Sequence, residues 1–145
     1  MKKFFKRILC PIDIQDEMAF ALDVAQSLGE GPDTTICILF ILPVVLSSAP
    51  AVNPLPITES EAQRELHKIA RKHLPGNIHY EIYTKIRTDP ASAILSTIEK
   101  LGIDSVVMST HGRKGIGRLI LGSVAERVVR EAPCPVVTVR ETAAK

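Results

Sequence analysis

Five short runs of apolar and β-branched residues predict five β-strands, and four segments with helical spacing lie between them. The runs are RILCPI (7–12), TTICILFIL (34–42), NIHYEIYTKIR (77–87), SVVM (105–108) and PVVTV (135–139). Each intervening segment repeats apolar residues three and four positions apart, as on the buried face of an amphipathic helix. Strands that alternate with helices through short connections predict parallel pairing with right-handed crossovers.

Capping residues mark where the predicted helices begin and end. Thr58 and Glu61 form a capping-box pair at the start of the second helix, and Ser123 and Glu126 repeat that pattern at the start of the fourth. The other boundary signals are Asp89-Pro90 at the start of the third helix, and Gly29, Gly102 and Pro133 at helix ends.

The third strand differs from the others because apolar and polar residues alternate along it. Its apolar positions share one face, while Glu81, Lys85 and Arg87 share the other. This pattern predicts a strand at a sheet edge with one solvated face, whereas the continuously apolar strands are covered on both faces. The prediction is a single domain, 1–145, with an open, doubly wound, Rossmann-like α/β fold. It has a parallel five-stranded sheet in the order 3-2-1-4-5 and helices on both faces.

Composition and charge mainly exclude classes of function. The 145 residues are 46% hydrophobic and 23% charged with a net charge of +2, so charge alone does not predict nucleic-acid binding. Only 4% are aromatic and none is Trp, which argues against a base-stacking surface. The apolar run at 8–12 is too short for a signal peptide, and no later run is long enough to span a membrane. Three cysteines without CxxC spacing indicate neither a disulfide framework nor a zinc site, so a cytoplasmic location is expected.

Two loops stand out. The segment 43–57 holds four prolines and has neither helical nor strand periodicity. The segment 109–128 holds four glycines and four cationic side chains between the end of a strand and the start of a helix. Unpaired amides at a helix start suit a phosphate, and Arg113, Lys114, Arg118 and Arg127 would add positive charge. The alternative is a solvated, flexible basic turn, because neither a Walker A loop nor a GxGxxG fingerprint is present.

Several candidate residues also have simpler structural interpretations. Asp13 ends the first strand at the edge where doubly wound sheets bind ligands, but it could instead cap the first helix. Ser123 could cap the fourth helix or donate to a phosphate. His111 has no nucleophile or carboxylate at a spacing that predicts a triad, so no catalytic residue is assigned. The remaining histidines show no metal-ligand spacing, so no protein-bound metal is predicted.

Three stretches resemble the universal stress protein family: CPID at the end of the first strand, STHGRKGIGRLILGS, and APCPVVTVR near the end of the chain. Nucleotide-binding members carry a glycine, two residues, a second glycine, nine residues, and then Gly-Ser or Gly-Thr. Gly112 and Gly122-Ser123 match this pattern, whereas Ser109 replaces its first glycine.

The resemblance implies an ATP site, with Mg²⁺ bridging the phosphates, between the first and fourth strands. The positions it implies are Pro11, Ile12, Asp13, Ile41, Met108, Ser109, His111, Gly112, Arg113, Gly122, Ser123 and Val124. It also implies a homodimer formed through the last strand, 136–139, and neither a nucleic-acid nor a membrane partner is expected.

The function expected on these grounds is a nucleotide-dependent binding or signalling module of the stress response. Two alternatives remain open: a slow ATPase that uses the loop cations, and a dimeric interaction protein without nucleotide binding.

Overall fold

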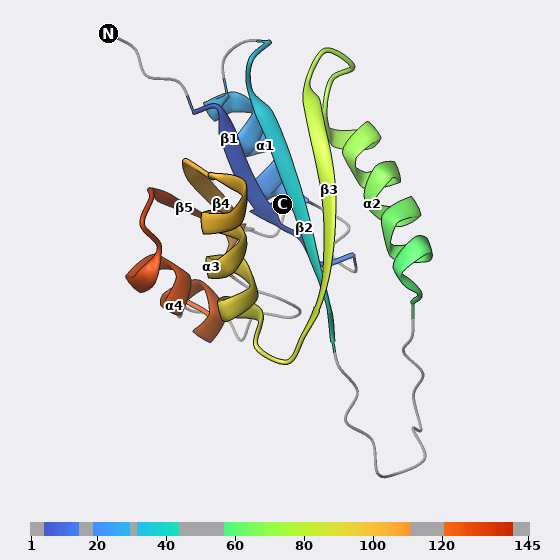
Figure 1. Ribbon diagram of the computed structural model, residues 1–145. Coiled ribbons are helices and arrows are strands. Elements are labelled where there is room, and N and C mark those ends of the chain that lie inside the picture. The colour runs from blue at the N-terminus through green and yellow to red at the C-terminus, as the bar shows by residue number, and fades with distance from the viewer. Residues whose placement is uncertain (1–4, 15–18, 30–31, 44–56, 111–120, 141–145) are drawn as a thin grey trace, which may run out of the picture.

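The computed structural model describes residues 5–14, 19–29, 32–43, 57–110 and 121–140. Its nine elements alternate between strand and helix (Figure 1). They are β1 (Arg7–Pro11), α1 (Phe20–Leu28), β2 (Thr35–Pro43), α2 (Glu59–His73), β3 (His79–Arg87), α3 (Pro90–Leu101), β4 (Ser105–Ser109), α4 (Ser123–Glu131) and β5 (Val136–Val139). The five strands pair in parallel in the order β3-β2-β1-β4-β5. The predicted doubly wound sheet is therefore confirmed.

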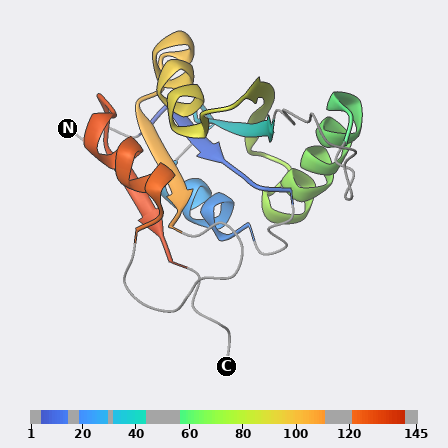
Figure 2. The same cartoon turned by 90° about the horizontal axis from the view of Figure 1, so that it is seen from below.

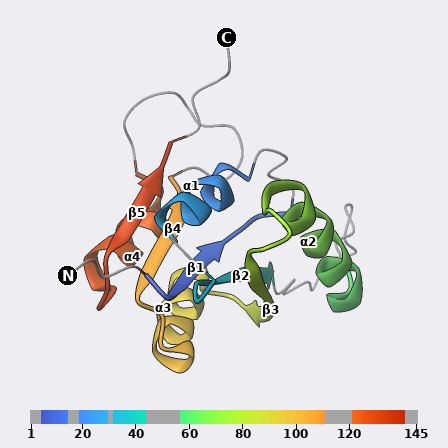
Figure 3. The ribbon, with the colours of Figure 1, turned by 90° about the horizontal axis from the view of Figure 1, so that it is seen from above.

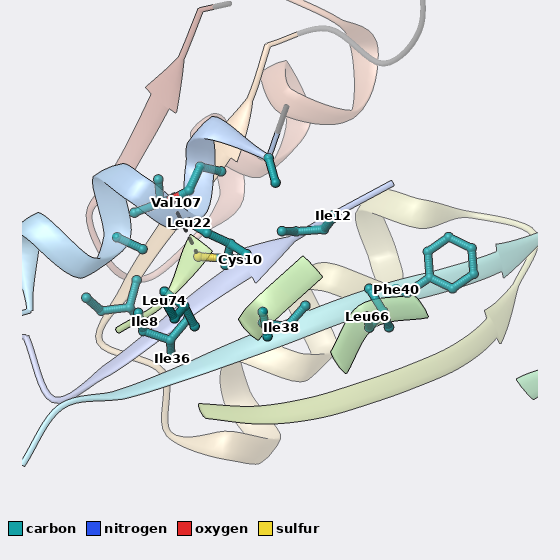
Figure 4. Close-up of a cluster of buried hydrophobic side chains, with 14 of the residues drawn as sticks. Ile8, Cys10, Ile12, Leu22, Ile36, Ile38, Phe40, Leu66, Leu74 and Val107 are labelled. Atoms are coloured by element: carbon teal, nitrogen blue, oxygen red, sulfur yellow. Dashed lines mark hydrogen bonds between the residues drawn. The ribbon is translucent and has the colours of Figure 1, made fainter. Parts of the chain in front are cut away.

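The sheet separates two apolar clusters, one beneath each pair of helices. Figure 3 shows α1 and α2 on one side of the sheet and α3 and α4 on the other. Ile8, Ile36 and Ile38 pack under α1 and α2 (Figure 4), while the adjacent positions Leu9, Cys37 and Leu39 pack under α3 and α4. All six are 0% exposed. Successive strand residues point to opposite faces, which is why a strand covered on both faces needs the unbroken apolar run that the sequence has.

Local capping signals set most of the helix boundaries. Thr58 and Glu61 form both halves of a capping box at the start of α2. Asp89 caps α3 by accepting from the amide of Ser92, and Gly102 ends that helix at φ 61°, a left-handed conformation that favours glycine. These three predictions are confirmed, as is the end of α1 at Gly29.

The expectation of a solvated face on β3 is only partly right. β3 is an edge strand, but its charged face is half-buried beside α3. There Glu81 accepts from Arg7 at 3.0 Å and from the hydroxyl of Tyr83. Arg7 also donates to the carbonyl of Leu101 at 2.9 Å, at the carboxyl end of α3. The hydrogen bonds from Tyr83 and Arg7 lower the pKa of Glu81, which favours its charged form although a third of its side chain is exposed.

Ser105, at the start of β4, is 0% exposed, and its hydroxyl has no hydrogen-bond partner within the described part of the chain. An unpaired buried hydroxyl costs about 1–3 kcal/mol, so Ser105→Ala is expected to raise the free energy of unfolding by about 1 kcal/mol in urea denaturation. Thr97→Val is the matched control, because the Thr97 hydroxyl already donates to the carbonyl of Ala93 at 2.7 Å. Equal gains at both positions, or a loss at Ser105, would contradict this explanation.

Two further expectations concern the proline-rich segment and membrane-spanning helices. Residues 44–56 of the proline-rich segment lie outside the described residues. Among the helices of the described ranges, none combines the length and the apolar character needed to cross a membrane.

Candidate functional site

β1 and β4 are neighbouring parallel strands, paired at Ile8–Ser105 and Leu9–Val106, so both run toward the same end of the sheet (Figure 2). Pro11 pairs with Leu39, and the amide of Ile12 donates to the carbonyl of Leu39 at 2.9 Å, which extends the β1–β2 ladder beyond the last strand residue. Continuing the β1–β2 register places Asp13 level with Ile41, whereas the pairing of β1 with β4 ends at Leu9 and Val106, four residues before Asp13. The strand order reverses at this place, which is where doubly wound sheets bind ligands.

Asp13 reaches this edge because of the strand, not because it caps a helix. The helix α1 begins at Phe20, and its N-cap residue is Ala19. The capping interpretation of Asp13 is therefore wrong, and the half-buried carboxylate stays a candidate for ligand contact.

Thr110 and Gly122, which flank the glycine-rich loop between β4 and α4, meet beside β4. The amide of Thr110 donates to the carbonyl of Val139 at 3.0 Å, which fixes this residue to β5. Its carbonyl accepts from the amide of Gly122 at 3.1 Å. A Cβ atom on Gly122 would lie 2.9 Å from that carbonyl oxygen, closer than a side chain can approach backbone. Glycine is therefore needed here for close packing, although its φ of −57° suits any residue.

The fourth helix begins one residue earlier than its capping-box pattern predicts. Gly122 is the N-cap residue and makes no side-chain cap, while Ser123 is the first helical residue and is exposed. The first helical hydrogen bond runs from the amide of Glu126 to the carbonyl of Gly122 at 2.9 Å. The amides of Ser123, Val124 and Ala125 consequently have no acceptor within the helix, which makes this helix start suitable for an anion.

The apolar candidates are mostly core residues. The side chain of Met108 is 5% exposed and packs in the cluster under α3 and α4, with Ile41 and Val124 at its margin. Ile12 is 7% exposed and packs in the cluster on the opposite face. The structure thus brings the main chain of these residues to the carboxyl edge but divides their side chains between the two faces. Pro11 and Ser109 end β1 and β4 at the same edge and are half-buried.

Three predicted positions, His111, Gly112 and Arg113, lie outside the described residues. The cationic role expected of Arg127 is wrong. Its guanidinium donates to Asp89 at 2.6 Å, Glu131 at 2.9 Å and Ser92 at 3.0 Å, so its positive charge is matched by carboxylates on α3 and α4. Hydrogen bonds from Ser92 and from Arg127 hold the pKa of Asp89 at about 2.

Thr110 is a further candidate residue at this end of the sheet, which the family pattern does not name. Its hydroxyl oxygen is buried at the base of the loop and has no hydrogen-bond partner among the described residues. A buried hydroxyl of this kind can hold a loop amide or a ligand oxygen, either of which would satisfy it. The only sequence signal was its place directly after a predicted strand.

The described residues offer little conventional catalytic chemistry. They include no group of three His, Cys, Asp or Glu side chains placed to hold a metal ion. The cysteines are free thiols, and burial raises the pKa of Cys37 to about 11 and also raises the pKa of Cys134. Neither thiol is therefore activated as a thiolate nucleophile at neutral pH.

A parallel sheet whose strand order reverses between β1 and β4, with a helix start held beside it, defines the class of doubly wound α/β domains. Comparison with known proteins assigns the family. The model of the universal stress protein family matches residues 4–140, and the chain belongs to that family. Universal stress protein MJ0531 of Methanocaldococcus jannaschii is 29% identical over 147 residues, covering 97% of this chain and 85% of the relative.

Several solved structures share this fold, and their similarity covers nearly the whole chain. Hypothetical protein MJ0577 matches with a TM-score of 0.76 and 18% identity, covering 98% of this chain and 100% of the other. A universal stress protein in complex with cAMP matches with a TM-score of 0.67 and 19% identity, covering 97% and 100%. A family protein from Arabidopsis thaliana with AMP bound matches with a TM-score of 0.63 and 16% identity, covering 95% and 93%.

Proposed function

We propose that this universal stress protein binds ATP at the carboxyl edge of β1 and β4 and acts as a nucleotide-dependent module of the stress response. The observation that carries the proposal is the hydrogen bond of 3.1 Å from the amide of Gly122 to the carbonyl of Thr110. It holds the free amides of α4 next to the end of β4, one strand away from Asp13. Helix-start amides after one strand and a carboxylate after the neighbouring strand suit the phosphate and ribose ends of one nucleotide.

The roles of the individual residues follow from the family pattern. The amides after Gly122, together with Gly112 and Arg113, would surround the phosphates, and Mg²⁺ would bridge the phosphate oxygens with few protein ligands. Asp13 would accept from the ribose hydroxyls, and the main chain at Ile41 would meet the adenine. The cAMP and AMP named with two structural neighbours support an adenine nucleotide. The choice of ATP is the more specific part of this proposal.

Calorimetric titration of nucleotide-free protein tests the function. ATP with Mg²⁺ is expected to bind more tightly than AMP, and AMP more tightly than adenosine, because each added phosphate gains contacts at the helix start and the basic loop. Asp13→Ala should weaken the binding of all three ligands, because each of them carries the ribose. Asp33→Ala is the charge-matched control, since Asp33 is an exposed residue just before β2. An absence of binding heat, or adenosine binding as tightly as ATP, would refute the proposal.

We also propose a homodimer through β5. This strand is a sheet edge, and Val136, Val137 and Val139 are only half-buried along it. An apolar edge strand exposes unpaired backbone groups that a second copy can pair with. Light scattering over a dilution series should show a mass that falls from dimer to monomer, and a constant monomer at high micromolar concentration would argue against it.

The three free cysteines suit a reducing cytoplasm, where we place the protein.

A further inference from the structure

Few apolar side chains hold α4 against the core, although this helix carries part of the proposed site. It has nine residues, of which Ala125 and Val128 are buried and Val124 is partly buried against the same cluster. Three small side chains fix the distance of a helix from the sheet better than they fix its rotation about its own axis. Polar contacts to a neighbouring element therefore have more influence on the direction of its first amides than they would in a deeply buried helix.

Arg127 supplies such contacts. Its Nη1 donates to Asp89 at 2.6 Å and its Nη2 donates to the Ser92 hydroxyl at 3.0 Å, so the planar guanidinium bridges α4 to the first turn of α3. Its Nε donates to Glu131 at 2.9 Å, which holds the side chain along its own helix. We refer to Arg127, Asp89 and Ser92 as the Arg127 clamp.

The α3 end of the clamp is held by its own capping hydrogen bonds. Asp89 is the N-cap residue of α3, and its carboxylate accepts from the Ser92 amide at 3.4 Å and from the Ser92 hydroxyl at 2.6 Å. The helix α3 itself is firmly packed, because five of its twelve residues are buried. Arg127 therefore contacts the more firmly packed of the two helices, so α4 is the element whose orientation these contacts would influence.

The clamp acts close to the free amides. Arg127 lies four residues after Ser123, on the same side of the helix and one turn away from it. A rotation of α4 that displaced Arg127 would also turn the amides of Ser123 and Val124. We propose that Arg127 is a positioning residue, which with Asp89 and Ser92 holds the α4 amides in the direction that the nucleotide phosphates require. This inference rests on the proposed function.

The opposing explanation is electrostatic, because a cation and an anion near the phosphates would also change affinity through their charges. The two explanations predict opposite signs for Asp89→Asn. Removing a negative charge would strengthen ATP binding if charge alone mattered. If the clamp positions α4, the loss of the Arg127 contact weakens ATP binding about three- to tenfold, although asparagine still caps α3. Ser92→Ala, which changes no charge, should weaken it in the same direction.

Titration of the folded full chain with ATP and with adenosine provides the test. Wild type is measured first, so that a failure of the proposed function is seen independently of the clamp. In Asp89→Asn and Ser92→Ala, ATP affinity should fall while adenosine affinity stays unchanged, because adenosine has no phosphate to meet the amides. Arg130→Gln is the control on the same helix, since Arg130 pairs only with Glu126 among the described residues, and it should change affinity less than about twofold.

Two results would overturn the inference. One is ATP binding that is tighter than in wild type, or unchanged, in both Asp89→Asn and Ser92→Ala, provided that the wild type itself binds ATP. The other is an equal loss for adenosine and ATP, which would indicate a general disturbance of the fold. A double variant, Asp89→Asn with Arg127→Gln, should lose no more affinity than Arg127→Gln alone, because both changes open the same contact.

Discussion

Gly122→Ala is expected to weaken ATP binding by about tenfold or more, because the loss of one hydrogen bond to a charged phosphate costs about 1.5 kcal/mol or more. The new methyl group would lie 2.9 Å from the carbonyl oxygen of Thr110, and this neighbour is backbone that cannot rotate away. The start of α4 must then move away from β4, which carries the amides of Ser123 and Val124 away from the end of the strand. Alanine is also a poor N-cap residue.

The measurement is calorimetric titration with ATP alongside thermal unfolding. The same substitution should lower the free energy of unfolding by about 1–3 kcal/mol, the usual cost of forcing a methyl group into packed structure. Gly76→Ala is the matched control, since a Cβ atom there would meet no atom within 4 Å. Full ATP affinity in a folded Gly122→Ala protein would show that the close approach of Gly122 to Thr110 is not needed for binding.

Leu22→Ala is expected to give the largest loss of stability, about 3–4 kcal/mol, through lost transfer free energy and the cavity left behind. Leu22 is 0% exposed and lies between α1 and the sheet, where Figure 4 shows it beside Cys10 and Val107. The surrounding strands are covered on both faces, so they have little freedom to collapse into the space. Urea denaturation measures the change in the free energy of unfolding.

The control for Leu22 is Val129→Ala, which also shortens an apolar side chain within a helix. Val129 is 45% exposed, and its truncation should change stability by no more than about 0.5 kcal/mol. Similar losses for the two variants would show that the α1 side of the sheet is not the tightly packed core described here.

The features that the sequence predicted well are those set by residues close together along the chain. The boundaries of α3 follow from Asp89, Pro90 and Gly102, each of which acts on its own helix end. The parallel pairing follows from the alternation of strands and helices, and the edge position of β3 follows from its mixture of apolar and polar residues. These signals need no knowledge of distant partners, which explains why they succeed.

The features that the sequence missed depend on distant partners. Ser123 looks like an N-cap residue, but the contact between Gly122 and Thr110 shifts the helix start by one residue. Arg127 looks like a phosphate ligand, but its partner Asp89 lies 38 residues earlier. The charged face of β3 looks solvated, but Arg7, 74 residues before Glu81, covers part of it. A pattern along the chain carries no information about which of several possible partners the fold supplies.

The central claim is that the free amides of α4 meet the phosphates of a nucleotide at the β1–β4 edge. The backbone amide signals of ¹⁵N-labelled protein, followed during addition of ATP with Mg²⁺ and then of adenosine, test it residue by residue. The account predicts that ATP shifts the amide signals of Ser123, Val124 and Ala125, and that adenosine leaves these three unchanged while it perturbs signals near Asp13 and Ile41. Saturating ATP that leaves the three α4 amides unshifted, or that shifts only signals of α2 and β3, would contradict it.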